Sequence, residues 1–305
     1  MRLISLILLF LLSGTVSAQK VEWYTTTQTS PWVKQKVKPE RTTTGAEIVL
    51  DPAQRLQLIT GIGGCFNEMG WDALNALSAE DREAVLQAIF GKDGACFDYC
   101  RLPMGANDFA MSFYSSADVA GDFNLVNFNI DRDRYILIPY IKAARQINPD
   151  LRIWASPWCP PPWMKTNNHY ASAVRPSGEK DVNGLLPHEA IAEFSTGFRM
   201  EEGYLKTYAD YFARFIKAYE AEGLPLECIH VQNEPCSNQV FPSCKWRTED
   251  LTFFLGHYLG PTFERENIKT DIYFGTINTS NPDYVRTALR DEQAAKYIKG
   301  VGFQW

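Results

Sequence analysis

The sequence has no excess of basic residues. Its 30 lysine and arginine side chains are outnumbered by 36 aspartate and glutamate side chains, which gives a formal net charge of −6 at pH 7. A nucleic-acid partner needs a basic surface, so this balance argues against DNA or RNA binding. What the chain does have is 45% hydrophobic residues over 305 positions, enough to fill the core of a large domain.

Histidine is scarce, and cysteine follows no metal-binding pattern. None of the four histidines has a partner at metal-ligand spacing, and the seven cysteines match no zinc motif. We therefore expect neither a metal ion nor a cofactor. The odd number of cysteines is also not a disulfide framework. A bridge between Cys236 and Cys244, which flank a short loop, stays open.

Long apolar runs are missing after the first residues. No later segment has the 18 uninterrupted apolar residues of a membrane span. The start has a positive residue at Arg2, an apolar run over residues 3–12 and small residues before Ala18. This pattern is typical of a secretory signal peptide. We expect residues 1–18 to be removed and the mature protein to be secreted or periplasmic.

Short apolar runs alternate with helical stretches from about residue 58 onward. The helical stretches have recognisable ends, such as Ser78 with Asp81 three residues later, and an apolar stripe predicts a helix over residues 202–222. Strands that alternate with helices predict a parallel sheet of right-handed βαβ units. Six runs are predicted as strands: residues 58–64, 98–104, 151–156, 227–232, 271–276 and 300–305.

Polar and aromatic clusters follow nearly every predicted strand. Chemistry contributed by the ends of many strands is typical of a (β/α)8 barrel, whereas an open doubly wound sheet concentrates it at one switch point. We therefore expect an α/β fold, a (β/α)8 TIM barrel over residues 56–305, with about six of its eight strand-helix units present. Residues 19–55 are expected to form one or two strands outside the barrel.

Glu234 lies in the segment Gln232-Asn233-Glu234-Pro235, directly after a predicted strand. A carboxyl group at the mouth of a barrel, beside an asparagine that can bind a sugar hydroxyl, suits general-acid cleavage of a glycoside. A turn glutamate is the competing interpretation, since Asn-Glu-Pro is also reasonable turn chemistry. Glu68 follows the first predicted strand too, but an acid at a helix start is its better interpretation.

Four motifs follow one another along the chain: residues 61–64, 101–109, 155–167 and 232–235. Together and in this order they resemble glycoside hydrolase family 30, which includes the glucosylceramidases and the microbial endo-β-1,6-glucanases. The resemblance covers roughly residues 58–305, and it implies a retaining β-glycosidase on a TIM barrel.

The resemblance implies a role for several single residues. Glu234 is similar to the family's acid/base, and Asn233 to the asparagine that binds the sugar 2-hydroxyl. Asp108 and Trp158 are similar to residues that hold the outer hydroxyls of the sugar in subsite −1. Arg101 resembles an arginine beneath the two carboxylates, where its charge keeps the nucleophile ionised, although pairing with a buried acid is the alternative.

Gln304 and Trp305 fall where many relatives have His-Trp at the end of the sixth strand. Trp305 is expected to wall the sugar, while the departure to glutamine leaves the role of Gln304 open. The family's nucleophile follows the seventh strand, so we expect it outside this chain and expect these 305 residues alone to be inactive. Residues 19–55 resemble the N-terminal strands of an accessory β-sandwich.

The sequence therefore favours hydrolysis of β-glucosidic bonds in a glucosylceramide-like lipid or in β-1,6-glucan. The expected partner is a carbohydrate or glycolipid substrate. A relative that acts on β-xylan or a β-fucoside stays open, because such relatives share catalytic residues and differ in their loops. A non-catalytic carbohydrate-binding relative is a third possibility, against which the Asn233-Glu234 pair argues.

Overall fold

The computed structural model describes residues 21–38, 51, 53–175 and 183–304. The chain divides into two compact units, residues 1–58 and 59–305. In the first unit, strands β1 (Trp23–Thr25) and β2 (Val33–Gln35) pair antiparallel in a hairpin. The expected signal peptide, residues 1–18, lies outside the described residues. Among the helices that the structure describes, none is long and apolar enough to cross a membrane.

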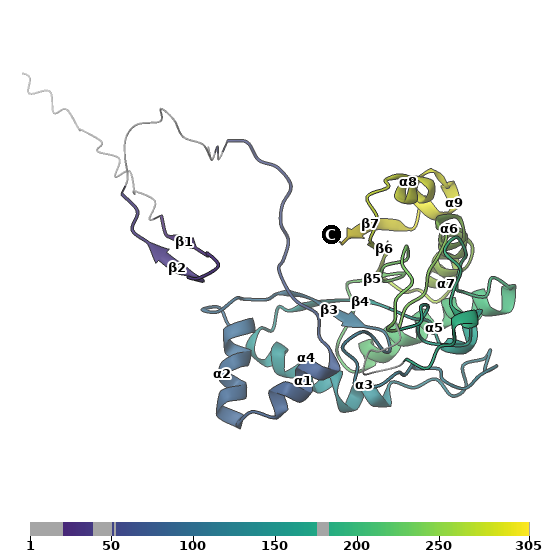
Figure 1. The fold of residues 1–305 in the computed structure, drawn as a ribbon, viewed down its shortest axis with the longest axis horizontal. Helices are drawn as coiled ribbons and strands as arrows, with labels where there is room; N and C mark the ends of the chain where they lie inside the picture. Colours follow the sequence, from purple (N-terminus) through teal and green to yellow (C-terminus); the bar gives the residue numbers. More distant parts are fainter. Residues whose placement is uncertain (1–20, 39–50, 52, 176–182, 305) are drawn as a thin grey trace, which may run out of the picture. The chain divides into compact units, whose positions relative to one another are not determined.

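The second unit is built on a five-stranded parallel sheet in the order β3-β4-β5-β6-β7 (Figure 1). Each strand pairs with the next one along the chain, and helices lie in every connection, as in the predicted βα units of a TIM barrel. The strands are β3 (Tyr99–Pro103), β4 (Arg152–Ser156), β5 (Cys228–His230), β6 (Asp271–Ile277) and β7 (Ile298–Phe303).

The first predicted strand, residues 58–64, does not form a regular strand. It runs beside β3, where the Gly64 carbonyl accepts a hydrogen bond of 2.8 Å from the Arg101 backbone N–H. Glycines weaken a strand because they offer no side chain to pack. At Gly63 there is no room for one, since a Cβ would lie 2.1 Å from the carbonyl oxygen of Tyr99. The close approach of this segment to the backbone of β3 therefore takes the place of a regular ladder of strand hydrogen bonds.

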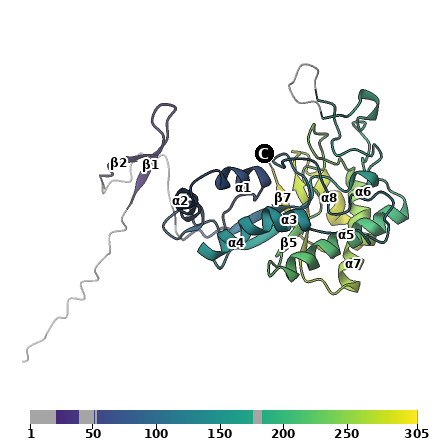
Figure 2. The same ribbon diagram turned by 90° about the horizontal axis from the view of Figure 1, so that it is seen from below.

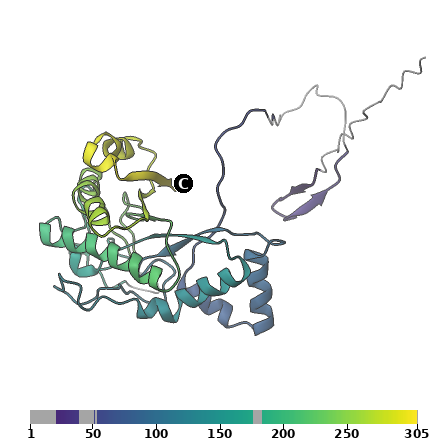
Figure 3. The same cartoon turned by 180° about the vertical axis from the view of Figure 1, so that it is seen from behind.

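Helices cover the outer face of the sheet (Figures 1 and 3). Helices α1 (Glu68–Asn75) and α2 (Ala79–Phe90) precede β3, and α3 (Asp131–Tyr135) and α4 (Leu137–Ile147) precede β4. Helix α5 (Glu202–Ala221) precedes β5. Helix α6 (Thr248–Phe254) continues through a π-helical turn (Leu255–Leu259) into α7 (Gly260–Arg265). Helices α8 (Asp283–Arg290) and α9 (Glu292–Ala295) precede β7.

Two short 3-10 turns, Pro162–Met164 and Pro187–Glu189, lie in the long connection between β4 and α5.

Helix ends and faces follow the sequence signals. The Ser78 hydroxyl accepts the backbone N–H of Asp81 at 3.1 Å and caps α2 as predicted. The predicted stripe of α5 is buried, and its Tyr208 ring lies 5.3 Å from the Phe254 ring of α6. Burying an apolar side chain of this size stabilises the fold by about 1.5–3 kcal/mol. Figure 2 shows α5 between α4 and α7, so it anchors the connection that leads into β5.

The inner side of the sheet opens into a cavity of about 550 Å³ that is lined in part by Trp154, His230 and Tyr273. The His230 ring lies 4.4 Å from the Trp154 ring and 4.8 Å from the Tyr273 ring. Burial lowers the pKa of His230 to about 4, and its Nδ1 lies 3.0 Å from the Gly275 carbonyl oxygen. Strand β7 pairs with β6 on one side, and no described strand pairs with its other edge.

Candidate active site

A second cavity, of about 400 Å³, lies at the carboxyl ends of the strands. Because parallel strands present these ends at the same edge, side chains far apart in the sequence meet there. Every predicted site residue that the structure describes lines this cavity, while Trp305 lies outside the described residues. The lining residues are Arg101, Asp108, Trp158, Asn233, Glu234, Gln239, Phe241 and Gln304.

Glu234 adopts a left-handed backbone conformation just beyond β5. Its φ is +47°, which costs a non-glycine residue about 1–2 kcal/mol. Its backbone N–H donates to the carbonyl oxygen of Thr276 in β6 (3.1 Å), and its own carbonyl accepts the N–H of Ser237 (3.2 Å). The backbone of Glu234 therefore makes the turn that one interpretation predicted, and its buried carboxyl group lines the cavity, as the other interpretation requires.

The side chain of Asn233 is held in one orientation by three donors. Its Oδ1 accepts hydrogen bonds from Arg101 Nη2 (2.7 Å), Thr276 Oγ1 (3.0 Å) and Gln304 Nε2 (2.9 Å). With the amide oxygen fixed in this way, the Nδ2 group is the one that can donate to a ligand hydroxyl in the cavity. Gln304, whose role the sequence left open, thus helps to orient Asn233.

Arg101 supports the cavity from β3. Its guanidinium carbon lies 3.8 Å from the centre of the Trp158 ring and 5.0 Å from that of Trp154. Its Nε and Nη2 donate to Ser156 Oγ at 3.0 and 2.6 Å. The hydrogen-bond partners of its side chain among the described residues are Ser156 and Asn233, so the alternative of a pair with a buried acid is not seen there. Burial lowers the pKa of Arg101 to about 10.

Asp108 lies at the exposed rim, on the loop that follows β3. Partial desolvation raises the pKa of its carboxyl group, and the positive charge of Arg101 opposes that effect. The loop is anchored by Glu68, the first residue of α1, which accepts the backbone N–H of Met111 at 2.8 Å. Glu68 also forms a two-pronged ion pair of 2.7 Å with Arg132, so it is the structural helix-start acid that the sequence indicated.

Gln239 and Phe241 were missed by the sequence analysis. Both come from the loop after Glu234, and Gln239 Nε2 donates to Glu234 Oε2 at 3.1 Å. No strand end or motif marks this position, because the contact depends on how the loop folds back. Thr276 was also missed, although its place at the end of a predicted strand was a usable signal.

Lys165 explains how that loop is held. Its side chain is fully buried, and its Nζ lies within hydrogen-bond distance of the carbonyl oxygens of Tyr170 (2.9 Å), Ala171 (3.1 Å) and Ser243 (2.7 Å) and of Ser172 Oγ (3.3 Å), four acceptors that share its three N–H groups. A buried ammonium group needs such a set of acceptors. The ammonium therefore ties the loop after β4 to the loop after β5.

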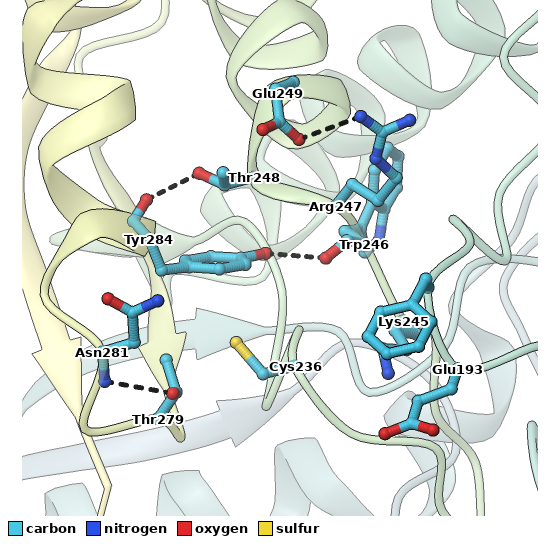
Figure 4. A pocket seen from close by; sticks show the side chains of 11 residues that line it. Glu193, Cys236, Lys245, Trp246, Arg247, Thr248, Glu249, Thr279, Asn281 and Tyr284 are labelled. Atoms are coloured by element: carbon cyan, nitrogen blue, oxygen red, sulfur yellow. Dashed lines mark hydrogen bonds and ion pairs between the residues drawn. The ribbon is translucent and has the colours of Figure 1, made fainter.

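A smaller cavity of about 360 Å³ lies beside the turn at Glu234, where Cys236 contributes to its wall (Figure 4). Tyr284 donates to the carbonyl oxygen of Trp246 at 2.9 Å, and Arg247 pairs with Glu249 at 3.4 Å. No carboxyl group at the end of a strand lines this cavity, so the cavity at Glu234 is the better candidate for the active site.

The bridge considered between Cys236 and Cys244 is not formed, since both are free thiols. The described residues also contain no cluster of three or more histidine, cysteine or acidic side chains that could hold a metal ion.

Comparisons with known proteins show the family to which the chain belongs. The model of the glycosyl hydrolase family 30 TIM-barrel domain matches residues 59–305, which confirms the resemblance of the four motifs. Putative glucosylceramidase 4 of Caenorhabditis elegans is 29% identical over 307 residues, covering 96% of this chain and 54% of that protein. Lysosomal acid glucosylceramidase of Mus musculus is 27% identical over 278 residues, covering 88% and 50%.

Among solved structures, an endo-β1,6-glucanase is 25% identical with a TM-score of 0.71, covering 92% of this chain and 59% of that one. The chain spans about half the length of the curated relatives it matches.

Proposed function

Because the chain belongs to glycosyl hydrolase family 30, we propose that it carries the acid/base half of a retaining β-glycosidase site. The observation that carries this proposal is the cavity where the Glu234 carboxyl, the Asn233 amide and the Trp158 ring meet above Arg101. A buried carboxyl group beside an oriented donor is what a glycoside needs at its scissile bond.

In the first step, Glu234 donates its proton to the leaving oxygen while a second carboxylate attacks the anomeric carbon. In the second step, the ionised Glu234 takes a proton from water, and that water displaces the enzyme carboxylate from the sugar. The Nδ2 group of Asn233 donates to the sugar 2-hydroxyl in both steps.

The second carboxylate lies about 5–5.5 Å from the first in retaining enzymes. The described carboxyl groups of the cavity belong to Asp108 and Glu234, and the resemblance gives Asp108 the outer sugar hydroxyls. Arg101, which has no carboxylate partner among the described residues, suits an ionised carboxylate above it. We therefore propose that the nucleophile lies outside these residues, and that these 305 residues alone do not turn over a glycoside.

The substrate we propose is a β-glucosidic bond, in a glucan or a glycolipid. Two relatives carry the name glucosylceramidase, and the similar solved structure is an endo-β1,6-glucanase. Secretion or a periplasmic location, with cleavage near Ala18, remains part of the proposal.

Glu234→Gln tests the assignment in a protein that also supplies the second carboxylate. Turnover of alkyl and sugar leaving groups should fall by orders of magnitude, while an activated aryl β-glucoside should lose less in its first step because it needs little proton donation. Added azide should restore deglycosylation and give a β-glycosyl azide. Equal loss on every substrate, without azide rescue, removes Glu234 from the acid/base role.

A further inference from the structure

The carboxyl group of Glu234 has a hydrogen-bond donor of its own. The Nε2 group of Gln239 lies 3.1 Å from Oε2, and among the described side chains no other hydrogen-bonds that carboxyl. Because Glu234 is 8% exposed, little solvent is present to compete with this contact. The two oxygens of the carboxyl group are therefore unequal, since Oε2 is occupied by a donor and Oε1 is not.

We propose that Gln239 is a positioning residue that makes Oε1 of Glu234 the oxygen that carries and delivers the catalytic proton. A carbonyl-type oxygen accepts a hydrogen bond better than the hydroxyl oxygen of a carboxylic acid. The Gln239 contact thus favours the proton on Oε1 in the acid form and stabilises the ionised form after the proton has left. The inference rests on the proposed function of Glu234.

The backbone geometry brings the two side chains together. The left-handed φ of +47° at Glu234, with the turn bond from the Ser237 N–H to its carbonyl, reverses the chain directly after β5. Gln239 follows five residues later on the returning segment, and both residues line the same cavity. A backbone strained in this way persists where the surrounding structure determines it.

Gln239 is also fixed from behind. Its carbonyl oxygen accepts the backbone N–H groups of Ser172 (3.1 Å) and Ala173 (2.9 Å), and its own N–H donates to Ser243 Oγ (3.2 Å). The buried ammonium of Lys165 binds Ser172 Oγ and the Ser243 carbonyl oxygen. Gln239 therefore presents its amide from a rigid support, as a residue that orients a catalytic group must.

The first test needs no turnover. With glutamate labelled with ¹³C at its carboxyl carbon, the carboxyl bands of Glu234 are identified in the infrared spectrum by their loss in Glu234→Gln. In Gln239→Leu the carbonyl band of the protonated carboxyl group should move to higher frequency, because the amide donor on Oε2 has gone. Gln239→Met, which keeps the length of the side chain but also lacks the donor, should move the band in the same direction.

Asn238→Ala is the matched control. It removes the hydrogen bond from Asn238 Nδ2 to the Ile191 carbonyl oxygen (2.7 Å) in the same loop without touching Glu234, so the carbonyl band of Glu234 should stay in place. An unchanged band in both Gln239 variants, or the same move in Asn238→Ala, overturns the proposal. Gln239→Met is close to glutamine in length, so it keeps the test available if Gln239→Leu does not fold.

The second test measures kcat/KM in the protein that supplies the second carboxylate. Gln239→Leu should lose about 10- to 100-fold on sugar and alkyl leaving groups and less than about 3-fold on a dinitrophenyl glucoside. If Glu234→Gln shows its leaving-group dependence and Gln239→Leu slows all substrates equally, the positioning role is overturned and the proposed function stands. If Glu234→Gln shows no leaving-group dependence, the proposed function fails, while the infrared band still reports on the contact of Gln239 with Glu234.

Discussion

The guanidinium group of Arg101 stacks on the indole ring of Trp158, with 3.8 Å between the guanidinium carbon and the ring centre. The same group donates to Ser156 and to Asn233, so one side chain of β3 joins the ends of β4 and β5. Stacking and forked donation both require a planar group, which a lysine does not have.

Arg101→Lys should therefore lower kcat/KM by an amount that corresponds to about 2–4 kcal/mol of lost transition-state stabilisation. It should also lower the melting temperature. The protein to assay is one that supplies the second carboxylate. Arg145→Lys is the matched control, because Arg145 donates to the carbonyl oxygens of Leu151 and Gly223 and does not line the cavity. Equal activity in the two variants contradicts a supporting role for Arg101.

Asp108→Ala and Trp158→Ala test the sugar-binding walls. Each should raise the barrier for an intact sugar by about 2–4 kcal/mol, because a hydrogen bond or an aromatic wall is lost. The measurement is kcat/KM on an unactivated β-glucoside, after circular dichroism has shown that both variants fold. Near wild-type values in both indicate that subsite −1 is built from other residues.

The strained backbone at Glu234 predicts an unusual order of stability. At most positions glycine is less favourable than alanine, but a φ of +47° suits glycine and strains alanine. The free energy of unfolding of Glu234→Gly should therefore be about 1 kcal/mol higher than that of Glu234→Ala, although both variants lack the carboxyl group. Urea unfolding of the two variants measures the difference, and an alanine variant at least as stable as the glycine variant refutes it.

The buried imidazole of His230 predicts an acid-labile contribution to stability. Its pKa falls from 6.5 to about 4 on folding, so the unfolded chain binds more protons between these values. The contribution is fully present above pH 6.5 and is lost as the pH falls toward 4, by about 3 kcal/mol. Asp133 acts in the opposite direction, since burial raises its pKa to about 6.

His230→Asn keeps an N–H group that can reach the Gly275 carbonyl and does not titrate. The difference in unfolding free energy between variant and parent, measured at pH 7.5, 5.5 and 4, isolates His230 from Asp133. That difference should shift in favour of the variant as the pH falls. A difference that is constant with pH contradicts the assignment.

The edge of β7 with which no described strand pairs predicts self-association of these 305 residues when they are expressed alone. Phe303, on this strand, is 69% exposed, and open backbone groups at a sheet edge pair readily with another chain. Light scattering should show a mass that rises with concentration. Phe303→Lys should reduce it, whereas Phe194→Lys, which changes an exposed ring away from the sheet, should not. A monomer that unfolds cooperatively and hydrolyses a β-glucoside contradicts both this prediction and the proposed absence of the nucleophile.

The sequence predicted the features that repeat and missed those that depend on loop paths. Strands β3, β4 and β6 and the buried stripe of α5 follow from periodicity, and the site residues Arg101 and Glu234 follow from positions in or just after a strand. The prediction of a regular strand over residues 58–64 was wrong, because it was based on the apolar residues of the segment and did not take its glycines into account. Gln239 could not be found, since its approach to Glu234 depends on hydrogen bonds to residues far earlier in the chain, such as Ser172.

The ammonium group of Lys165 hydrogen-bonds to the loop after β4 and to the loop after β5. We therefore expect the sequences of these two loops to change together in evolution. A graft that exchanges only the segment 239–243 for that of another enzyme can displace the Ser243 carbonyl oxygen from a cation that is shielded from water, and a graft of segment 165–173 alone replaces the cation from which that carbonyl accepts a hydrogen bond. Changes in the groups that border Glu234 should therefore spread through a lineage, or succeed in a chimera, when both segments are exchanged together.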